Sequence, residues 1–97
     1  MEETIYLSTL FDYYGVLLTD KQRLYFEDYY FNNLTLSEMS INNNISRNAV
    51  HKQIKDATLK LKQYEEKLKL YEKSKKINKL LEQIKDEKIK KEIKELI

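Results

Sequence analysis

The chain has 97 residues, of which 41% are hydrophobic and 35% charged, and its formal net charge is +2. This length suits one small domain with a modest core. The sequence has no cysteine and a single histidine, which excludes disulfides, thiolate metal sites and multi-histidine metal sites. We expect no cofactor. One glycine and no proline leave few helix breakers and predict an all-α protein, while the lack of a membrane-length apolar run or a recognisable signal peptide predicts a cytoplasmic protein with no membrane partner.

The first predicted helix covers residues 2–14, with Gly15 placed as its C-terminal stop. Apolar residues at helical spacing give this segment a broad apolar face, and Glu2 and Glu3 lie near the positive end of the helix dipole. Tyr6 and Tyr13 would serve either a ligand surface or packing. Packing is the commoner use of aromatic residues at this spacing, and we favour it here.

The second predicted helix starts with a capping box formed by Thr19 and Gln22 and ends at Asn32 and Asn33. Five of the seven residues from 25 to 31 are aromatic, a density that would also suit stacking on the bases of a single strand. Glu27 and Asp28 would repel a nucleic acid from this segment, so the aromatic block is expected to form the core.

Residues 35–55 (TLSEMSINNNISRNAVHKQIK) predict a short helix, a polar turn and a second helix. Thr35 and Glu38 form another capping box, and Ser46 is an N-cap that marks the start of the second helix. Residues 42–44 are three asparagines, which tolerate the left-handed conformation of a tight turn. Apolar side chains that would close the two helices onto a common core are Leu36, Met39, Ile45, Val50 and Ile54. This is the pattern of a helix-turn-helix, although a plain helical hairpin would share it.

The second of these helices would enter the major groove of duplex DNA by its N-terminus. Its outward polar side chains suit phosphate and base-edge contacts, and the candidate DNA-binding residues are Ser46, Arg47, Asn48, His51, Lys52 and Lys55. Residues 1–45 carry two basic and seven acidic side chains, whereas residues 46–97 carry sixteen basic and nine acidic ones. The charge therefore changes sign where the candidate recognition helix begins, as expected for a nucleic-acid reader.

The apolar residues of the candidate recognition helix belong to a heptad repeat that continues past Lys55, and we call this repeat the heptad seam. Its members are Val50, Ile54, Ala57, Leu61, Tyr64, Leu68 and Tyr71. We expect this helix to project beyond the core and to bury its seam against either the folded-back C-terminal helices or the same helix of a second chain. The predicted organisation is a domain over residues 1–72 and a C-terminal helical extension over residues 73–97.

A turn is predicted at residues 73–76, followed by an amphipathic helix with Ile77, Leu80, Leu81 and Ile84 and a last helix capped by Asp86. The lysines of this half would form either a second nucleic-acid patch or a solvated face, and alternation with glutamate favours the solvated face. Homodimerisation through the C-terminal helices is expected.

Three segments resemble the YlxM-like family, which is linked with the bacterial signal recognition particle. They are LTDKQRLYFEDYYFNNLTLSEMS (residues 18–40), ISRNAVHKQIK of the candidate recognition helix, and the following YEEKLKLYEK. The helix-turn-helix is similar to region 4 of bacterial sigma factors. The resemblance implies an all-helical, often dimeric DNA-binding or regulatory protein, whose relatives are placed in the particle's pathway because their genes lie beside that of its GTPase.

Two functions therefore follow from the sequence and the resemblance. The first is duplex DNA binding through the helix that begins at Ser46. The alternative is a protein-interaction module that modulates the GTPase or RNA of the signal recognition particle through the C-terminal half. No enzyme is expected, because there is no catalytic pairing of side chains, and the adjacent carboxylates Glu65 and Glu66 are interpreted as solvated charges.

Overall fold

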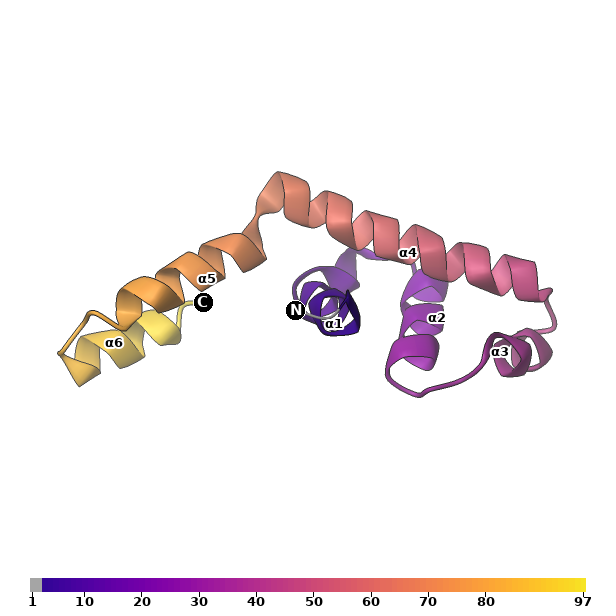
Figure 1. Cartoon of the computed structure of the whole chain (residues 1–97), viewed down its shortest axis with the longest axis horizontal. Coiled ribbons are helices and arrows are strands. Elements are labelled where there is room, and N and C mark those ends of the chain that lie inside the picture. Colours follow the sequence, from indigo (N-terminus) through magenta and orange to yellow (C-terminus); the bar gives the residue numbers. More distant parts are fainter. Residues whose placement is uncertain (1–2) are drawn as a thin grey trace.

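The computed structural model describes residues 3–97, and these residues form six α-helices and one 3₁₀ turn with no strand (Figure 1). In chain order they are α1 (Glu3–Tyr14), the 3₁₀ turn η1 (Gly15–Leu17), α2 (Asp20–Tyr30), α3 (Leu36–Asn43), α4 (Arg47–Leu68), α5 (Leu70–Leu81) and α6 (Glu87–Lys94). The predicted all-α class is confirmed; Glu2, expected in the first turn of α1, lies outside the described residues. Within residues 3–97, each helix is too short or too polar to span a bilayer.

The predicted helix starts are confirmed in atomic detail. In each of the two capping boxes the threonine hydroxyl accepts from a backbone N–H, and the Gln22 or Glu38 side chain accepts in return from the threonine N–H, all at 3.1 Å. Asp86 Oδ1 accepts from two backbone N–H groups of α6 at 3.0 and 3.2 Å. These side chains satisfy amide groups that would otherwise have no partner at the helix starts, which fixes where each helix begins.

Gly15 does follow the end of α1, but its role differs from the one expected. Gly15, the one glycine of the sequence, does not have a positive φ, so it does not supply a left-handed stop. Gly15 is buried, and a Cβ atom at this position would lie 3.1 Å from the ring of Phe11. The glycine is therefore explained by the close approach of an aromatic side chain, which in turn stacks on Phe26 with ring centroids 4.7 Å apart.

The core consists of two clusters that both use α4. The first joins α1 and α2 to the middle of α4, and its buried members are Leu7, Leu10, Tyr14, Leu18, Phe26, Ala57 and Leu61. The second joins α2, α3 and the start of α4, and its buried members are Tyr25, Met39, Val50 and Ile54, with Leu36 and Ile45 packed against them. The five residues predicted to close the helix-turn-helix thus meet in one cluster. Buried Tyr25 and Phe26 confirm that the aromatic block of α2 contributes to the core.

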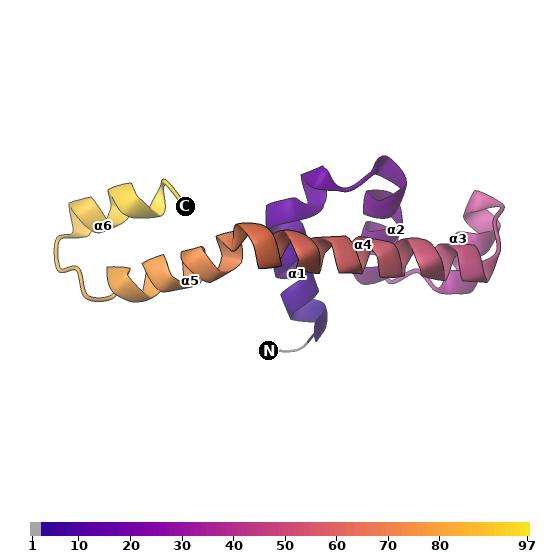
Figure 2. The same ribbon diagram turned by 90° about the horizontal axis from the view of Figure 1, so that it is seen from above.

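The heptad seam packs in a different place from the one predicted. Val50, Ile54, Ala57 and Leu61 are buried against α1, α2 and α3 of the same chain, rather than against the C-terminal helices or a second α4. Leu68, further along the seam, is 45% exposed. The first part of the seam packs into the core of its own domain because α1 and α2 cross under α4, as Figures 1 and 2 show.

The predicted turn at residues 73–76 is also wrong, because α5 runs through them without interruption. The helix breaks earlier, at Lys69, which adopts the left-handed conformation with a φ of 56°. The cause is Glu65, whose two carboxylate oxygens accept from the N–H groups of Tyr71 and Glu72, both at 3.1 Å. Glu65 is therefore the cap of α5 and not the solvated charge that the sequence indicated.

α5 and α6 form a hairpin that extends away from the rest of the molecule and gives it principal extents of 55 × 25 × 23 Å (Figures 1 and 2). Leu81 is the buried residue of α5, and α6 has none. Leu80 is 62% exposed and Leu96, just beyond α6, is 84% exposed. The hairpin thus carries apolar side chains that the described part of this chain does not cover.

Candidate nucleic-acid interface

The turn between α3 and α4 is a Schellman motif centred on Asn44. Asn44 has a φ of 53°, the Asn44 N–H donates to the carbonyl of Ile41 at 3.3 Å, and the Ile45 N–H donates to the carbonyl of Ser40 at 3.1 Å. These two hydrogen bonds provide donors for carbonyl groups at the C-terminal end of α3, which would otherwise have no partner in the helix. The Asn43 amide donates to the Met39 carbonyl at 2.8 Å, so two of the three asparagines have distinct structural roles.

The start of α4 follows directly from this turn. The Ser46 hydroxyl accepts from the Ala49 N–H at 3.0 Å, and Val50 and Ile54 anchor the next two turns in the second core cluster. Because these two anchors fix the rotation of α4 about its axis, they also decide which side chains face outward. A capped, exposed helix start held against a preceding short helix is the geometry with which helix-turn-helix proteins approach DNA.

All six candidate residues are exposed, and they fall on two adjoining stripes of α4. Asn48, Lys52 and Lys55 follow a spacing of four and three residues, which places them together on the side away from the buried anchors. Arg47 and His51 are also four residues apart and turn toward α2 and α3, where they line shallow hollows. Ser46 is the N-cap and directly precedes the first residue of α4.

Two of the hollows beside α4 involve residues that the sequence analysis did not select. Arg47 shares one, of about 390 Å³, with Tyr29 and Ser37, and His51 and Lys55 share another, of about 250 Å³, again with Tyr29. Tyr29 is 40% exposed although it belongs to the aromatic block that we expected to be core. The helical position gives no signal for this exposure, because Tyr29 follows the buried Tyr25 by four residues and the buried Phe26 by three, and so falls on their face of α2.

The basic side chains of this surface form none of the ion pairs found among the described residues. The ion pairs found in residues 3–97 join Arg23 to Asp20, Lys62 to Glu3, and Lys69 and Lys76 to Glu72. Over residues 47–58 the helix carries three basic side chains and one acidic side chain, Asp56. The outer face at the start of α4 therefore offers positive charge that is available to an anionic ligand.

Comparison with known proteins agrees with this geometry. A family model described as a helix-turn-helix protein, YlxM/p13 like, matches residues 1–97. The chain is 49% identical over 80 residues to a UPF0122 protein of Malacoplasma penetrans, covering 82% of this chain and 75% of the relative. It is 38% identical over 97 residues to a UPF0122 protein of Fusobacterium nucleatum, covering 100% of this chain and 94% of the relative. A UPF0122 protein of Caldanaerobacter subterraneus is 44% identical over 85 residues, which cover 88% of this chain and 73% of the relative.

Proposed function

Because the chain belongs to the YlxM/p13-like helix-turn-helix family, we propose that it binds duplex DNA through the N-terminal half of α4 and acts as a regulatory protein. The observation that carries the proposal is the Ser46-capped helix start, from which Asn48, Lys52 and Lys55 project on the face opposite the buried Val50 and Ile54. A helix presented in this way fits the major groove.

Each candidate residue has a role in this proposal. Arg47 and Lys55 contact phosphates and set the position of the protein on the duplex, while Ser46 offers its hydroxyl to a phosphate at the helix start. Asn48, His51 and Lys52 reach base edges, where an asparagine pairs with adenine and a lysine with guanine. Tyr29 and Ser37, beside Arg47, are further candidates for phosphate contact from α2 and α3.

The test compares two double variants that remove the same charge from α4. Replacing Arg47 and Lys52 by alanine should weaken duplex binding, because a phosphate contact and a base contact are lost, and should lower the salt slope by about 0.9 for the one phosphate that Arg47 contacts. Replacing the exposed Lys60 and Lys67 by alanine should change binding little. Fluorescence anisotropy with labelled duplex at two salt concentrations measures both, and equal losses in the two variants would overturn the proposal.

Homodimerisation through α5 and α6 is part of the proposal, because one helix-turn-helix module binds weakly and two modules read two half-sites. The exposed Leu80 and Leu96 support it. Replacing Leu80 by glutamate should shift the protein from dimer to monomer in sedimentation equilibrium. Replacing Val16, which is similarly exposed but lies in η1, by glutamate should leave the oligomeric state unchanged.

A second candidate function is supported by the α5–α6 hairpin, which a DNA-reading helix-turn-helix does not need. In this alternative the exposed apolar side chains of the hairpin contact a protein, and the family resemblance points to the GTPase or RNA of the signal recognition particle. Titrating the full chain against the particle and against duplex DNA distinguishes the two functions. Tight binding to the particle with feeble DNA affinity would favour the second. In either case we propose a binding protein without enzymatic activity, acting in the cytoplasm.

A further inference from the structure

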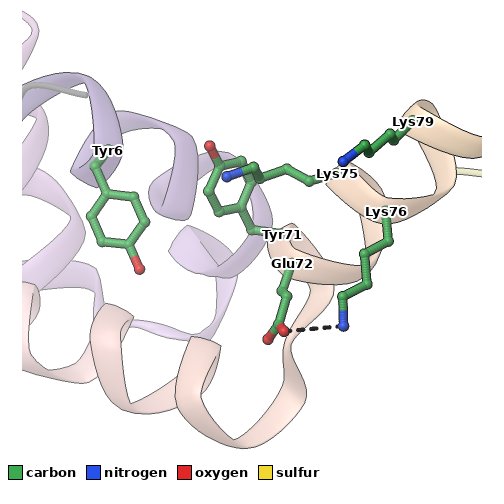
Figure 3. Close-up of a pocket in the computed structure, with 6 residues that line it drawn as sticks. All are labelled: Tyr6, Tyr71, Glu72, Lys75, Lys76 and Lys79. Carbon is green, nitrogen blue, oxygen red and sulfur yellow. Dashed lines mark ion pairs between the residues drawn. The ribbon is translucent and has the colours of Figure 1, made fainter.

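A hollow of about 430 Å³ lies between α1 and α5. It is lined by Tyr6, Tyr71, Glu72, Lys75, Lys76 and Lys79, and we call it the tyrosine–lysine hollow. Figure 3 shows Tyr6 reaching from α1 toward Tyr71, with Lys75 lying across the Tyr71 ring and Lys79 following one turn later. Aromatic faces and ammonium groups thus meet in one concave surface.

The aromatic part of the tyrosine–lysine hollow is built by contacts between distant parts of the chain. The rings of Tyr6 and Tyr71 have centroids 5.9 Å apart and are inclined by 56°, and the centroid of the Tyr13 ring lies 6.3 Å from that of Tyr71. Both Tyr6 and Tyr71 are half-buried, so their positions are fixed while part of each ring borders the hollow. Rings held in this way form a platform on which a flat base can stack with little loss of side-chain freedom.

The basic part of the hollow is a stripe on one face of α5. Tyr71, Lys75 and Lys79 follow each other at four-residue intervals and share that face, whereas Leu70, Ile77 and Leu81 lie on the opposite one. The Lys75 Nζ stands 5.3 Å from the centre of the Tyr71 ring. Leu80, the α5 side chain proposed for dimerisation, lines a neighbouring hollow with Lys76 and Lys79, but Tyr6, Tyr71 and Lys75 do not line that hollow. A second copy of the chain packed on Leu80 would therefore not need to cover the aromatic part of the tyrosine–lysine hollow.

The single acidic side chain of the hollow is neutralised. Glu72 lies 3.3 Å from Lys76 Nζ and 3.8 Å from Lys69 Nζ, and the hydrogen bond from Lys76 lowers the pKa of its carboxyl, with the charge of both lysines adding to the effect. α5 as a whole carries four lysines and one glutamate, a net charge of +3. Lys75 and Lys79 form none of the ion pairs found in residues 3–97, so their charges face the hollow without an acidic partner.

We propose that the tyrosine–lysine hollow binds single-stranded nucleic acid, with a base stacked on the Tyr6–Tyr71 pair and the adjoining phosphates held by Lys75 and Lys79. Interleaved aromatic and basic side chains are the combination with which proteins bind single strands with little sequence preference. Lys75 and Lys79 lie about one turn apart on α5, so a phosphate backbone that runs along this helix would meet both side chains. The hollow is also distinct from the start of α4, because the 22 residues of α4 span about 33 Å at about 1.5 Å per residue.

The experiment uses the full chain and labelled oligonucleotides of roughly 10 nucleotides, one of uridine and one of deoxythymidine, in fluorescence anisotropy. Replacing Lys75 and Lys79 by glutamine should lower the salt slope of single-strand binding by about 1.4, for two phosphates at about 0.7 each. The matched control replaces the exposed Lys91 and Lys94 of α6 by glutamine, which removes the same charge and should leave the slope unchanged. Replacing Tyr6 by leucine should weaken binding at least about fivefold.

Binding of either oligonucleotide with this pattern supports the proposal, and a preference for the uridine strand would assign the hollow to RNA. Failure to bind both strands, equal losses in the two lysine variants, or preferential capture of a glutamate-rich peptide would overturn it. The R47A/K52A variant should keep its single-strand binding, and the K75Q/K79Q variant should keep its duplex binding. The two proposals therefore fail independently. Far-UV circular dichroism of the tyrosine variant checks its fold, and the lysine variants test the hollow without disturbing the core.

Discussion

The hydroxyl of Tyr14 donates a 2.6 Å hydrogen bond to Oε1 of Glu65, and this contact joins the end of α1 to the break between α4 and α5. The same hydroxyl oxygen accepts from the Leu70 N–H at 3.0 Å. Lys69, the N-cap residue of α5, makes no side-chain hydrogen bond to the start of this helix. Tyr14 and Glu65 together satisfy three of the N–H groups there instead. The direction of the whole C-terminal hairpin depends on this pair.

Replacing Tyr14 by phenylalanine should lower the free energy of unfolding by about 1–3 kcal/mol, because it leaves the Leu70 N–H without its acceptor and removes one of the two donors to Glu65 Oε1. Urea unfolding followed by circular dichroism measures the change. The matched control is Tyr13 to phenylalanine, since the Tyr13 hydroxyl makes none of the hydrogen bonds found among residues 3–97. Equal midpoints for the two variants would show that the Tyr14–Glu65 bond contributes nothing to stability.

The stability of the protein should also depend on pH through Tyr14. Burial, and then the hydrogen bond to Glu65, raise the pKa of Tyr14 from 10.0 to about 12. Between these values the unfolded chain has lost the phenolic proton and the folded chain keeps it, so the unfolded state binds fewer protons and the free energy of unfolding falls as pH rises. The contribution is complete below pH 10 and is lost by about pH 12.

Urea midpoints at pH 9 and pH 11 measure this loss. Lysines titrate in the same range, so the quantity to compare is the difference between the wild-type chain and the Tyr14 to phenylalanine variant. The wild type should lose more stability than the variant over this interval. Parallel losses in both proteins would mean that Tyr14 titrates alike in the folded and unfolded states.

The sequence predicted the features of the fold that depend on neighbours in the chain. Capping by Thr19, Thr35, Ser46 and Asp86 is local, because each side chain reaches an amide two or three residues away. The outward position of the candidate DNA-binding residues followed from the register of the buried Val50 and Ile54 in the same way.

Features that depend on distant contacts escaped the sequence analysis. The break at Lys69 has no local signal, since lysine does not favour a positive φ, and it is stabilised by Tyr14, which lies 51 positions before Glu65. The tyrosine–lysine hollow likewise combines Tyr6 with lysines of α5. In the sequence these were two separate weak signals, each more simply explained by packing or by solvation.

Replacing Lys69 by glycine tests the position of the helix break. A side chain in the left-handed conformation costs roughly 1–2 kcal/mol, so the glycine variant should be more stable than the wild type by up to about 1 kcal/mol after its greater chain entropy is subtracted. The control is Lys60 to glycine, at an exposed position inside α4, which should cost about 1 kcal/mol. If both variants were destabilised alike, α4 would continue through Lys69 in solution.

The turn that positions α4 can be tested at Asn44. Valine at this positive φ should cost about 1–3 kcal/mol and should also weaken duplex binding, because the Schellman motif fixes the angle between α3 and α4. Glycine at the same position should be tolerated, since it adopts the left-handed conformation without strain. Valine at Asn42, which is exposed within α3, is the matched control and should change stability by less than about 1 kcal/mol.

Urea unfolding and duplex anisotropy should respond together at Asn44. A loss of stability there with unchanged DNA affinity would mean that the turn holds the fold but does not orient the recognition helix.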